Sequence, residues 1–233
     1  DYASEVRLAL MQIAQSTLRL QTAPLAGTLS LAILPAFGMR LLMPRLPDFS
    51  RLHPEVTINM ATRLEEFNFS AEPFDAAIHF GNADWPGTQS ILLKHEQLLP
   101  VCAPTLLGEM RVSSPTDILN FPLLHIQTRP LAWKHWFSGQ ADVSQLSFSG
   151  TMYDQFATIT QAALHGLGVA LMPDYLIEQD LAAGRLIALH PAPTETSGAY
   201  YLVWPETKSR HTALTKFRLW LATQSQPEDP LPR

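Results

Sequence analysis

The fold of this protein is decided by the stretch DQFATITQAALHGLGVALMPDY, residues 154–175. Apolar residues recur with helical spacing in its first half, at Phe156, Ile159 and Ala163. The two glycines of HGLG follow, and glycine adopts the left-handed backbone that ends many helices. The next residues, VALMP, are short and apolar, as in a buried strand closed by proline. The sequence therefore predicts a helix, a glycine stop and a strand, with Asp154 as the N-cap of the helix.

The glycines of this stretch do not indicate a nucleotide site. A phosphate-binding loop follows a strand and opens a helix, because the phosphate must meet the N-terminus of that helix. Here the helix comes first and the strand comes last. The GLG sequence is therefore predicted to end a helix and not to bind phosphate.

Strand-like and helix-like segments alternate along the rest of the chain, which favours a parallel sheet with right-handed crossovers. The most distinctive segments are GTLSLAILPAF (27–37), PRLPDFSRLHPEVTI (44–58), FDAAIHFGNADWPG (74–87), LLPVCAPTLL (98–107), LLHIQTRPLAWKHWF (123–137) and HGLGVALMP (165–173). In this order they resemble the effector-binding domain of LysR-type transcriptional regulators. The segment that begins at Leu123 resembles in particular the subgroup of glycine-cleavage activators and β-lactamase regulators.

The resemblance implies an α/β fold of two Rossmann-like lobes with a ligand cleft between them. This is the arrangement of periplasmic binding proteins of type 2. The chain is expected to cross between the lobes near residues 100–101 and again near residues 203–205. The implied division is residues 25–100 with 204–225 for lobe I and residues 101–203 for lobe II.

Residues 1–22 are predicted to form a linker helix that helps dimerisation. Its seam positions alternate by four and three, as in a coiled-coil heptad, at Val6, Leu10, Ile13, Thr17 and Leu20, and the polar Thr17 weakens the pattern. The alternative is an amphipathic helix that packs on its own domain. The resemblance implies that the helix joins the sensor to a winged helix-turn-helix, which is expected before Asp1. The missing initial methionine is interpreted as a sign of a fragment or a processed product.

The charge of the chain does not favour DNA binding by residues 1–233 themselves. The net charge is −5, whereas a protein that binds the phosphate backbone of DNA carries a basic face. Cys102 is the single cysteine, so no internal disulfide is possible and a reducing compartment is expected. No apolar run has membrane-spanning length, and the first residues lack the features of a signal peptide. We expect a cytoplasmic protein without membrane contacts and with a disordered tail at residues 226–233.

Two prolines divide the segment 36–52, whose apolar residues have helical spacing. A proline inside a helix costs about 3 kcal/mol, so the residues alone favour a short helical piece followed by a longer one. The family resemblance instead implies one helix that tolerates Pro44 and Pro47. Both interpretations are open from the sequence.

No motif in the sequence indicates an enzyme. The eight histidines form no i, i+4 pair and no HExxH motif, and the chain contains no CxxC, GxSxG or SxxK motif. Glu65 and Glu66 are adjacent, so their side chains diverge in regular structure. We therefore expect neither a metal ion nor a cofactor. The alternative function is a transporter's solute-binding protein, against which the heptad pattern and the missing secretion signal argue.

The ends of two predicted strands indicate an anion site. The strands at 28–34 and 147–153 each lead into a helix, so each offers backbone N–H groups at a positive helix end. If both ends face the cleft, the cleft suits a carboxylate or another small anion. Asp154 is assigned to capping and Gln155 to contact with the ligand.

The resemblance completes the expected ligand site. Its residues are Pro35, Ala36, Phe37, Phe67, Asn68, His125, Gln155 and Tyr200. The phenylalanines are expected to form apolar walls, and the polar side chains to orient the ligand by hydrogen bonds. Ala36 departs from the hydroxyl residue that much of the family carries, which leaves backbone N–H groups at that position. Trp133 and Trp136 are interpreted either as core residues or as one wall of the cleft.

The function implied by the resemblance is ligand sensing and oligomerisation. A small-molecule effector is expected to bind in the cleft and to control DNA binding and transcription by the full-length protein. Amino acids and cell-wall peptides both remain open as effectors. A homodimer or homotetramer is expected, in which segment 36–52 and strand 56–61 pack on the partner's helix that begins at Asp154. Leu42 is expected to be exposed on that surface.

Overall fold

The computed structural model describes residues 27–139, 144, 146–191 and 193–224, together with residues 2, 3, 6, 7, 10, 11 and 13. The predicted linker helix at 1–22 lies mostly outside these residues. The predicted disordered tail at 226–233 lies entirely outside them.

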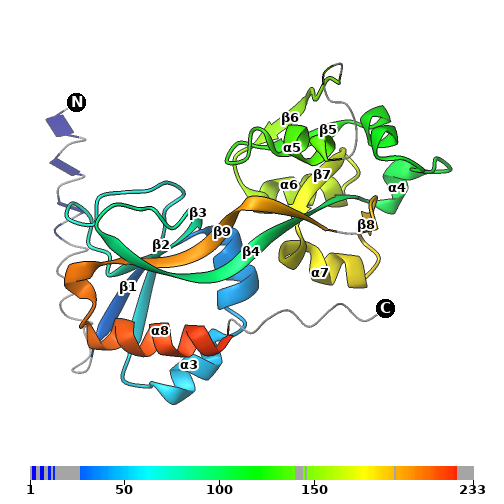
Figure 1. The fold of residues 1–233 in the computed structure, drawn as a ribbon. Coiled ribbons are helices and arrows are strands. Elements are labelled where there is room, and N and C mark those ends of the chain that lie inside the picture. Colours follow the sequence, from blue (N-terminus) through cyan, green and yellow to red (C-terminus); the bar gives the residue numbers. More distant parts are fainter. Residues whose placement is uncertain are drawn as a thin grey trace.

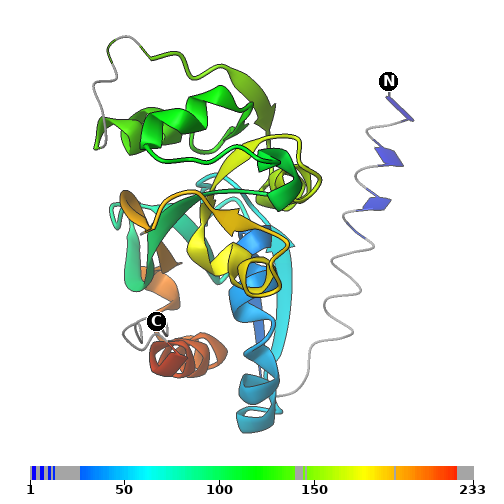
Figure 2. The ribbon, with the colours of Figure 1, turned by 90° about the vertical axis from the view of Figure 1, so that its right-hand side faces the viewer.

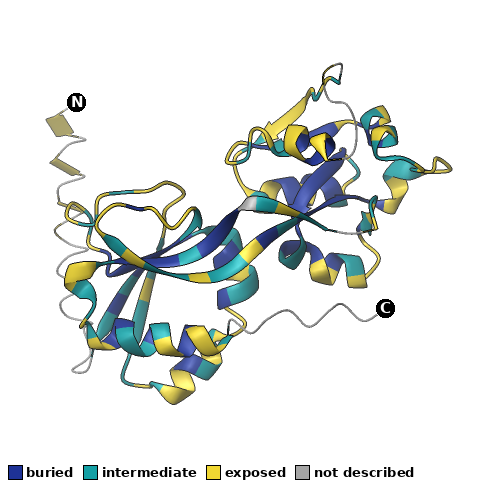
Figure 3. Ribbon diagram, in the orientation of Figure 1, coloured by how far each residue is buried: buried dark blue, intermediate teal, exposed yellow. Residues whose placement is uncertain are grey.

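Two α/β lobes are joined by a pair of long antiparallel strands, β4 (Thr88–Cys102) and β9 (Thr194–Pro205) (Figure 1). One mixed sheet runs through the described residues in the order β2-β1-β3-β9-β4-β7-β5-β6, and β8 pairs with β4. The central strands of each lobe are buried, while the outward faces of the helices are exposed (Figure 3). The predicted fold class is therefore confirmed.

Lobe I is built on three parallel strands, because β1 pairs with both β2 and β3 in parallel. Its strands are β1 (Thr28–Ile33), β2 (Thr57–Thr62) and β3 (Ala76–Gly81). Its helices are α2 (Pro35–Phe37), η1 (Gly38–Leu42), α3 (Leu46–Leu52), η3 (Glu206–Lys208) and α8 (Thr212–Gln224). An aromatic group of Phe49, Phe217 and Trp220 fills the core between α3 and α8.

Lobe II repeats the parallel arrangement, since β5 pairs in parallel with β6 and β7. Its strands are β5 (Leu123–Ile126), β6 (Gly150–Tyr153), β7 (Val169–Pro173) and β8 (Ile187–Ala188). Its helices are α4 (Pro104–Leu107), η2 (Pro115–Asn120), α5 (Ala132–Ser138), α6 (Phe156–Leu164) and α7 (Asp174–Ala182). Trp133 and Trp136 are each 2% exposed and pack in the core, and the Trp133 indole N–H donates to the Leu124 carbonyl at 2.9 Å. The interpretation of these tryptophans as core residues is therefore correct.

The predicted helix, glycine stop and strand are α6, residues 165–168 and β7. Gly166 has φ +73°, and its N–H donates to the Ala163 carbonyl while the Leu167 N–H donates to Ala162. These two hydrogen bonds form a Schellman motif, which satisfies the last carbonyls of the helix. Gly168 is required for a different reason, because a Cβ there would lie 2.4 Å from the Pro122 carbonyl oxygen. The glycines thus end a helix and admit a neighbouring strand.

The assignment of Asp154 as the N-cap of this helix is wrong. The N-cap of α6 is Gln155, whose backbone is extended and whose side chain makes no capping hydrogen bond. Asp154 lies one residue too early for its carboxylate to serve the first turn. The first N–H groups of α6 therefore have no side-chain cap.

The two prolines separate the segment after β1 into two helical pieces. A turn at residues 43–45 divides the π-helical η1 from α3. Pro47 lies in the first turn of α3, where a missing N–H costs no intrahelical hydrogen bond. The single-helix interpretation is therefore wrong. The division inferred from the prolines is correct, but α3 is not the longer of the two pieces, since α2 and η1 together are at least as long.

The long strands affect the predicted lobe boundaries. Residues 199–203 of β9 pair with β3 of lobe I, whereas residues 194–195 pair with residues 97–98 of β4. Tyr200 and Leu202 belong to the core of lobe I. We therefore propose that β9 passes between the lobes near residues 196–198, earlier than the sequence indicated. The rest of the predicted division stays a proposal.

Candidate ligand site between the lobes

A small cavity lies where the lobes meet beside the hinge strands. Its volume is about 70 Å³. Lobe I contributes Leu34, Pro35, Ala36, Phe37, Leu64 and Phe80. Lobe II contributes Thr128, Arg129, Asp154, Gln155, Phe156, Ala157 and Tyr175, and Tyr200 comes from β9. The cavity is therefore assembled from segments that are far apart in the sequence.

The starts of two helical segments meet at this cavity. The segment of α2 and η1 begins after Leu34, and α6 begins after Gln155. Neither start has a side-chain capping hydrogen bond. Backbone N–H groups at the start of a helix carry partial positive charge. This charge belongs above all to α6, because α6 is the longest of these helical elements. The helix starts therefore favour a negatively charged group in the cavity.

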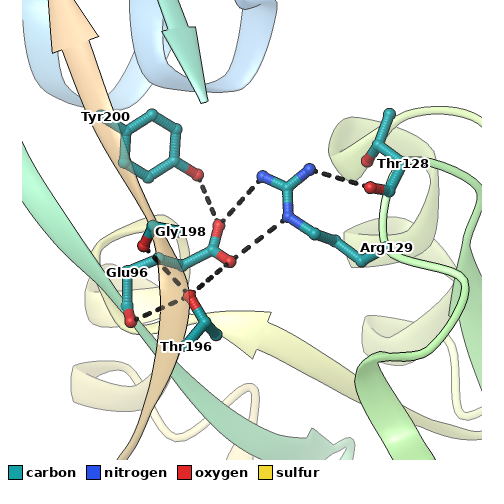
Figure 4. A network of polar contacts seen from close by, with 6 residues as sticks. All are labelled: Glu96, Thr128, Arg129, Thr196, Gly198 and Tyr200. Carbon is teal, nitrogen blue, oxygen red and sulfur yellow. Dashed lines mark hydrogen bonds and ion pairs between the residues drawn. The ribbon is translucent and has the colours of Figure 1, made fainter. Parts of the chain in front are cut away.

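A buried carboxylate organises the hinge side of the site (Figure 4). Glu96 is 0% exposed and lies in β4 at a register shift between His95 and Gln97. A bulge of this kind turns a side chain out of the regular alternation of the strand. The bulge thus explains how a charged residue enters the interior between the lobes.

Both oxygens of the Glu96 carboxylate accept hydrogen bonds, one of them from the hydroxyl of Tyr200 at 2.8 Å. Arg129 donates through Nε at 3.3 Å and through Nη2 at 3.2 Å. Thr196 Oγ1 lies 3.4 Å from the carboxylate, and its single proton is shared with the Gly198 carbonyl at 3.2 Å. A buried carboxylate is tolerated when it is paired and fully hydrogen-bonded, as here. Since Glu96 and Tyr200 belong to the hinge strands and Arg129 follows β5, the network ties lobe II to the hinge.

Arg129 also contacts lobe I through a cation–π interaction. Its guanidinium carbon lies 3.3 Å from the centre of the Phe80 ring, and its Nη1 donates to the Thr128 carbonyl at 3.1 Å. The ring, the carboxylate and the carbonyl hold the guanidinium on three sides. The orientation of Arg129 is therefore fixed before any ligand binds.

Aromatic side chains close the cavity towards the core of lobe I. Phe37, Tyr175 and Tyr200 form a cluster whose ring centres lie 4.9–6.1 Å apart. Burial raises the pKa of Tyr175 and of Tyr200 well above the usual tyrosine value. Both hydroxyls therefore stay protonated at neutral pH and act as hydrogen-bonding groups.

The lobes also touch on the outer side of the cavity, where η1 lies beside α7 (Figures 1 and 2). Arg40 donates to the Gln179 side chain at 3.1 Å and lies 3.7 Å from the buried carboxylate of Asp180. This is a second polar contact between the lobes. A change in their separation must therefore alter both contacts.

Five of the eight residues predicted from the sequence line the cavity: Pro35, Ala36, Phe37, Gln155 and Tyr200. Phe67 does not, because its ring packs against Phe69, Phe74 and Trp85. Asn68 does not either, because its Oδ1 accepts the Ser70 N–H at 2.8 Å within the same loop. The part of this loop that carries Phe67 and Phe69 thus folds into an aromatic cluster, and only Leu64, at the start of the loop, lines the cavity.

His125 is the third predicted residue that the cavity does not include. Alternation along β5 sends Leu124 and Ile126 into the core beside α6 and turns His125 to the opposite face. Burial lowers the pKa of His125, against a backbone hydrogen bond with Phe148 that raises it. Position at the end of a strand therefore did not suffice to place this side chain in the cleft.

Sequence reasoning missed Glu96, Arg129, Phe80 and Tyr175. Arg129 follows β5 at the carboxyl end of a parallel strand, which is where open α/β sheets bind ligands. Glu96 stands directly before the largely apolar run QLLPVCA. An isolated acidic residue beside such a run could have indicated a buried carboxylate. Their pairing, across 33 residues of sequence, was not visible in any pattern.

The residues that the structure describes contain neither a metal-binding cluster nor a membrane-spanning helix. No group of three or more His, Cys, Asp or Glu side chains among them could hold a metal ion. Within the same residues, no helix combines the length and the apolar character needed to cross a membrane.

Two lobes of open α/β sheet with a cavity at their junction define the class of two-lobed ligand-binding domains. Within this class, the model of the LysR substrate binding domain family matches residues 22–226. The chain belongs to this family.

Relatives and solved structures agree with this assignment. The glycine cleavage system transcriptional activator of Escherichia coli K12 is 29% identical over 232 residues, which cover 98% of this chain and 75% of the activator. The HTH-type transcriptional activator AmpR of Rhodobacter capsulatus is 34% identical over 197 residues, covering 84% and 66% respectively. The effector domain of AmpR from Pseudomonas aeruginosa superposes with a TM-score of 0.74 at 28% identity, covering 86% of this chain and 95% of that domain. The chain is thus a LysR-type effector-binding domain, and the alternative of a transporter's solute-binding protein is wrong.

Proposed function

We propose that the cavity between the lobes is the effector site and that its occupant controls DNA binding and transcription by the full-length regulator. The observation that carries the proposal is the convergence of two uncapped helix starts, Arg129 and Tyr200 on one cavity at the hinge. A ligand held there touches both lobes and the strands that join them. It therefore stabilises one separation of the lobes over others and shifts their equilibrium.

This role requires neither catalysis nor a cofactor. The relatives are transcriptional regulators, which supports a protein that binds its effector without converting it. Such a regulator acts where the DNA is, so we place it in the cytoplasm. DNA is contacted through a helix-turn-helix outside residues 1–233.

We further propose that the domain forms a homodimer, or a homotetramer built from such dimers. β2 is an edge strand of the sheet within the described residues. Beside it lies an open apolar groove of about 300 Å³, lined by Ile33, Pro35, Gly38, Met39, Met43, Met60, Ala61 and Thr62. Among the described residues, no strand pairs with the outer edge of β2, and an open edge next to exposed methionines favours association with a second chain. The expected partner element is α6 of a twofold-related copy.

Leu42, the position expected to be exposed on this surface, is 1% exposed and belongs to the core of lobe I. Its side chain points inward because η1 is wound as a π-helix, which changes the face each residue occupies. The exposed apolar side chains of the segment that line the groove are Met39 at 52% and Met43 at 43%. Interface variants should therefore be made at these methionines.

The effector site is tested by a thermal-shift screen of small metabolites with a blocked variant. Ala36→Leu adds a larger side chain at the cavity wall and is compatible with a helix. Its matched control is Ala222→Leu on the exposed face of α8. Metabolites that stabilise the protein and the control, but not Ala36→Leu, bind in the cavity. Equal stabilisation of all three proteins would place the binding elsewhere.

Gln155→Ala and Tyr200→Phe refine the test once an effector is found. Each should lower the affinity, by about 1–3 kcal/mol per buried hydrogen-bonding group. Unchanged affinity in both variants would contradict the proposed site while leaving the fold unaffected.

A further inference from the structure

We propose that Arg129 anchors the effector through a carboxylate and that the effector is a short carboxylic acid. This inference rests on the proposed effector site and names the chemistry of its occupant. It follows from the hydrogen bonds that Arg129 leaves unused, from the charges at the cavity and from the volume of the cavity.

The guanidinium of Arg129 has five N–H groups. Three of them donate to Glu96 and to the Thr128 carbonyl. Within the part of the chain that the structure describes, no acceptor takes the other two, one on Nη1 and one on Nη2. Figure 4 shows the edge between these two nitrogens without a contact, in the space between Tyr200 and Thr128. Arg129 lines the cavity, so this edge is available to a ligand.

Two parallel N–H groups on one planar edge match the two oxygens of a carboxylate. Glu96 cannot take this place, because its own oxygens already accept from Arg129, Tyr200 and Thr196. Glu96 acts instead as a positioning residue that holds the guanidinium in one orientation. A ligand carboxylate thus meets a preorganised partner and loses little affinity to the ordering of the Arg129 side chain.

The size of the cavity limits the rest of the ligand. About 70 Å³ is well below the roughly 300–1,000 Å³ of sites for drug-sized ligands. At roughly 30 Å³ per water it corresponds to about two water molecules. This volume accommodates a carboxylate with one or two further carbon atoms. A cell-wall peptide would require a wide separation of the lobes, so the structure favours the small acid.

Asp154 is the second charged group to consider, because it is exposed and also lines the cavity. An ammonium group on the ligand would be attracted to it, whereas a simple carboxylic acid gains nothing from it. Short carboxylic acids and small amino acids share the group that Arg129 recognises. The experiment must therefore separate these two sources of the same carboxylate.

The probes are acetate, propionate, glycine and L-alanine, with acetamide as a neutral match for acetate in shape. Each is titrated by calorimetry at constant ionic strength, so that screening of charge is the same throughout. We expect acetate or glycine to bind and acetamide to bind at least about tenfold more weakly, since hydrogen bonds between charged groups are lost. Tighter binding of glycine than of acetate would indicate a contact between the ammonium group of glycine and Asp154.

The decisive comparison uses Glu96→Gln and the double variant Glu96→Gln with Arg129→Gln. Both lack the buried carboxylate, so neither leaves an unpaired Glu96, and they differ at Arg129 alone. The binding carboxylate should lose at least about tenfold in affinity between the single and the double variant. Arg51→Gln, which changes a highly exposed arginine on α3, is the control for a loss of charge and should bind like the unaltered chain.

Equal affinity in the single and double variants, or equal binding of acetate and acetamide, would overturn the role of Arg129. Absence of binding by every carboxylate probe would overturn it as well. The effector site itself would survive these results if another metabolite still distinguished Ala36→Leu from Ala222→Leu. If no metabolite did so, the proposed function would fail together with this inference.

Discussion

Removal of one hydroxyl at the hinge, in Tyr200→Phe, should destabilise the protein measurably without changing its shape. The Tyr200 hydroxyl makes the shortest of the hydrogen bonds to Glu96, at 2.8 Å, and both residues are at most 1% exposed. The variant leaves the fully buried carboxylate with donors at 3.2–3.4 Å only. It also removes the partner of the Tyr175 hydroxyl.

A hydrogen bond to a charged group contributes roughly 1.5–3 kcal/mol. We therefore expect a loss of about 2 kcal/mol in the free energy of unfolding. In a domain of about 150–250 residues, 1 kcal/mol shifts Tm by roughly 2–4 °C, so the expected shift is about 4–8 °C downwards. Urea unfolding at neutral pH should show the same loss as a lower midpoint with an unchanged m-value.

The matched control is Tyr201→Phe, on the next residue of the same strand. Tyr201 faces the other side of the sheet, is only partly buried and stacks on His79. Its hydroxyl has no hydrogen bond to Glu96, so its removal should change Tm by less than half as much. Equal Tm values for the two variants would refute the claim that Glu96 depends on the hinge hydroxyl.

Three further predictions concern association, the buried thiol and acid stability. Met43→Glu should convert the dimer to monomers, as measured by light scattering. Leu219→Glu, at another exposed apolar site, is the control and should leave the dimer intact. The interface would be contradicted if the unaltered chain were a monomer at high concentration. Burial raises the pKa of Cys102 to about 11, so its thiol should resist alkylation at pH 8 until urea is added, and rapid labelling of the folded protein would contradict its burial. Backbone N–H groups of Ser114 and Ser113 lower the pKa of Asp117 below 3.8, so its stabilising effect is present above that pH and is lost as the pH falls through the folded pKa. Asp117→Asn should therefore flatten the fall of Tm below about pH 4, and an unchanged pH profile of Tm would argue against this hydrogen-bonded carboxylate.

The elements that the sequence predicted well are those with a local cause. The helix stop at Gly166 depends on left-handed backbone that glycine adopts freely, and the helix and strand around it depend on hydrophobic spacing. The division of the segment after β1 follows from the two prolines. Each of these features is set by residues within a few positions of one another, so the local sequence suffices to predict it.

The hinge strands were predicted only in part, for a physical reason. The sequence indicated crossings between the lobes near residues 100–101 and 203–205, but not that the strands there begin as early as Thr88 in β4 and Thr194 in β9. Residues 194–198 are polar, and residues 88–97 of β4 mix polar and apolar side chains without regular alternation, because β4 carries register shifts where it leaves lobe I. Their strand structure comes from pairing with each other and not from their own pattern.

The sequence by itself determined the family, because six segments in a fixed order resemble it, and this resemblance implied the two-lobed architecture. Local patterns of residues located the strand ends that lead into helices. It also placed Pro35, Ala36, Phe37, Gln155 and Tyr200 at the cavity. Only the tertiary structure decided which charged groups meet there. Glu96 enters the interior through a bulge and meets Arg129 across 33 residues of sequence, while the loop with Phe67 folds into its own aromatic cluster. Contacts of this kind arise from the packing of one lobe against the hinge, which no local pattern of residues encodes.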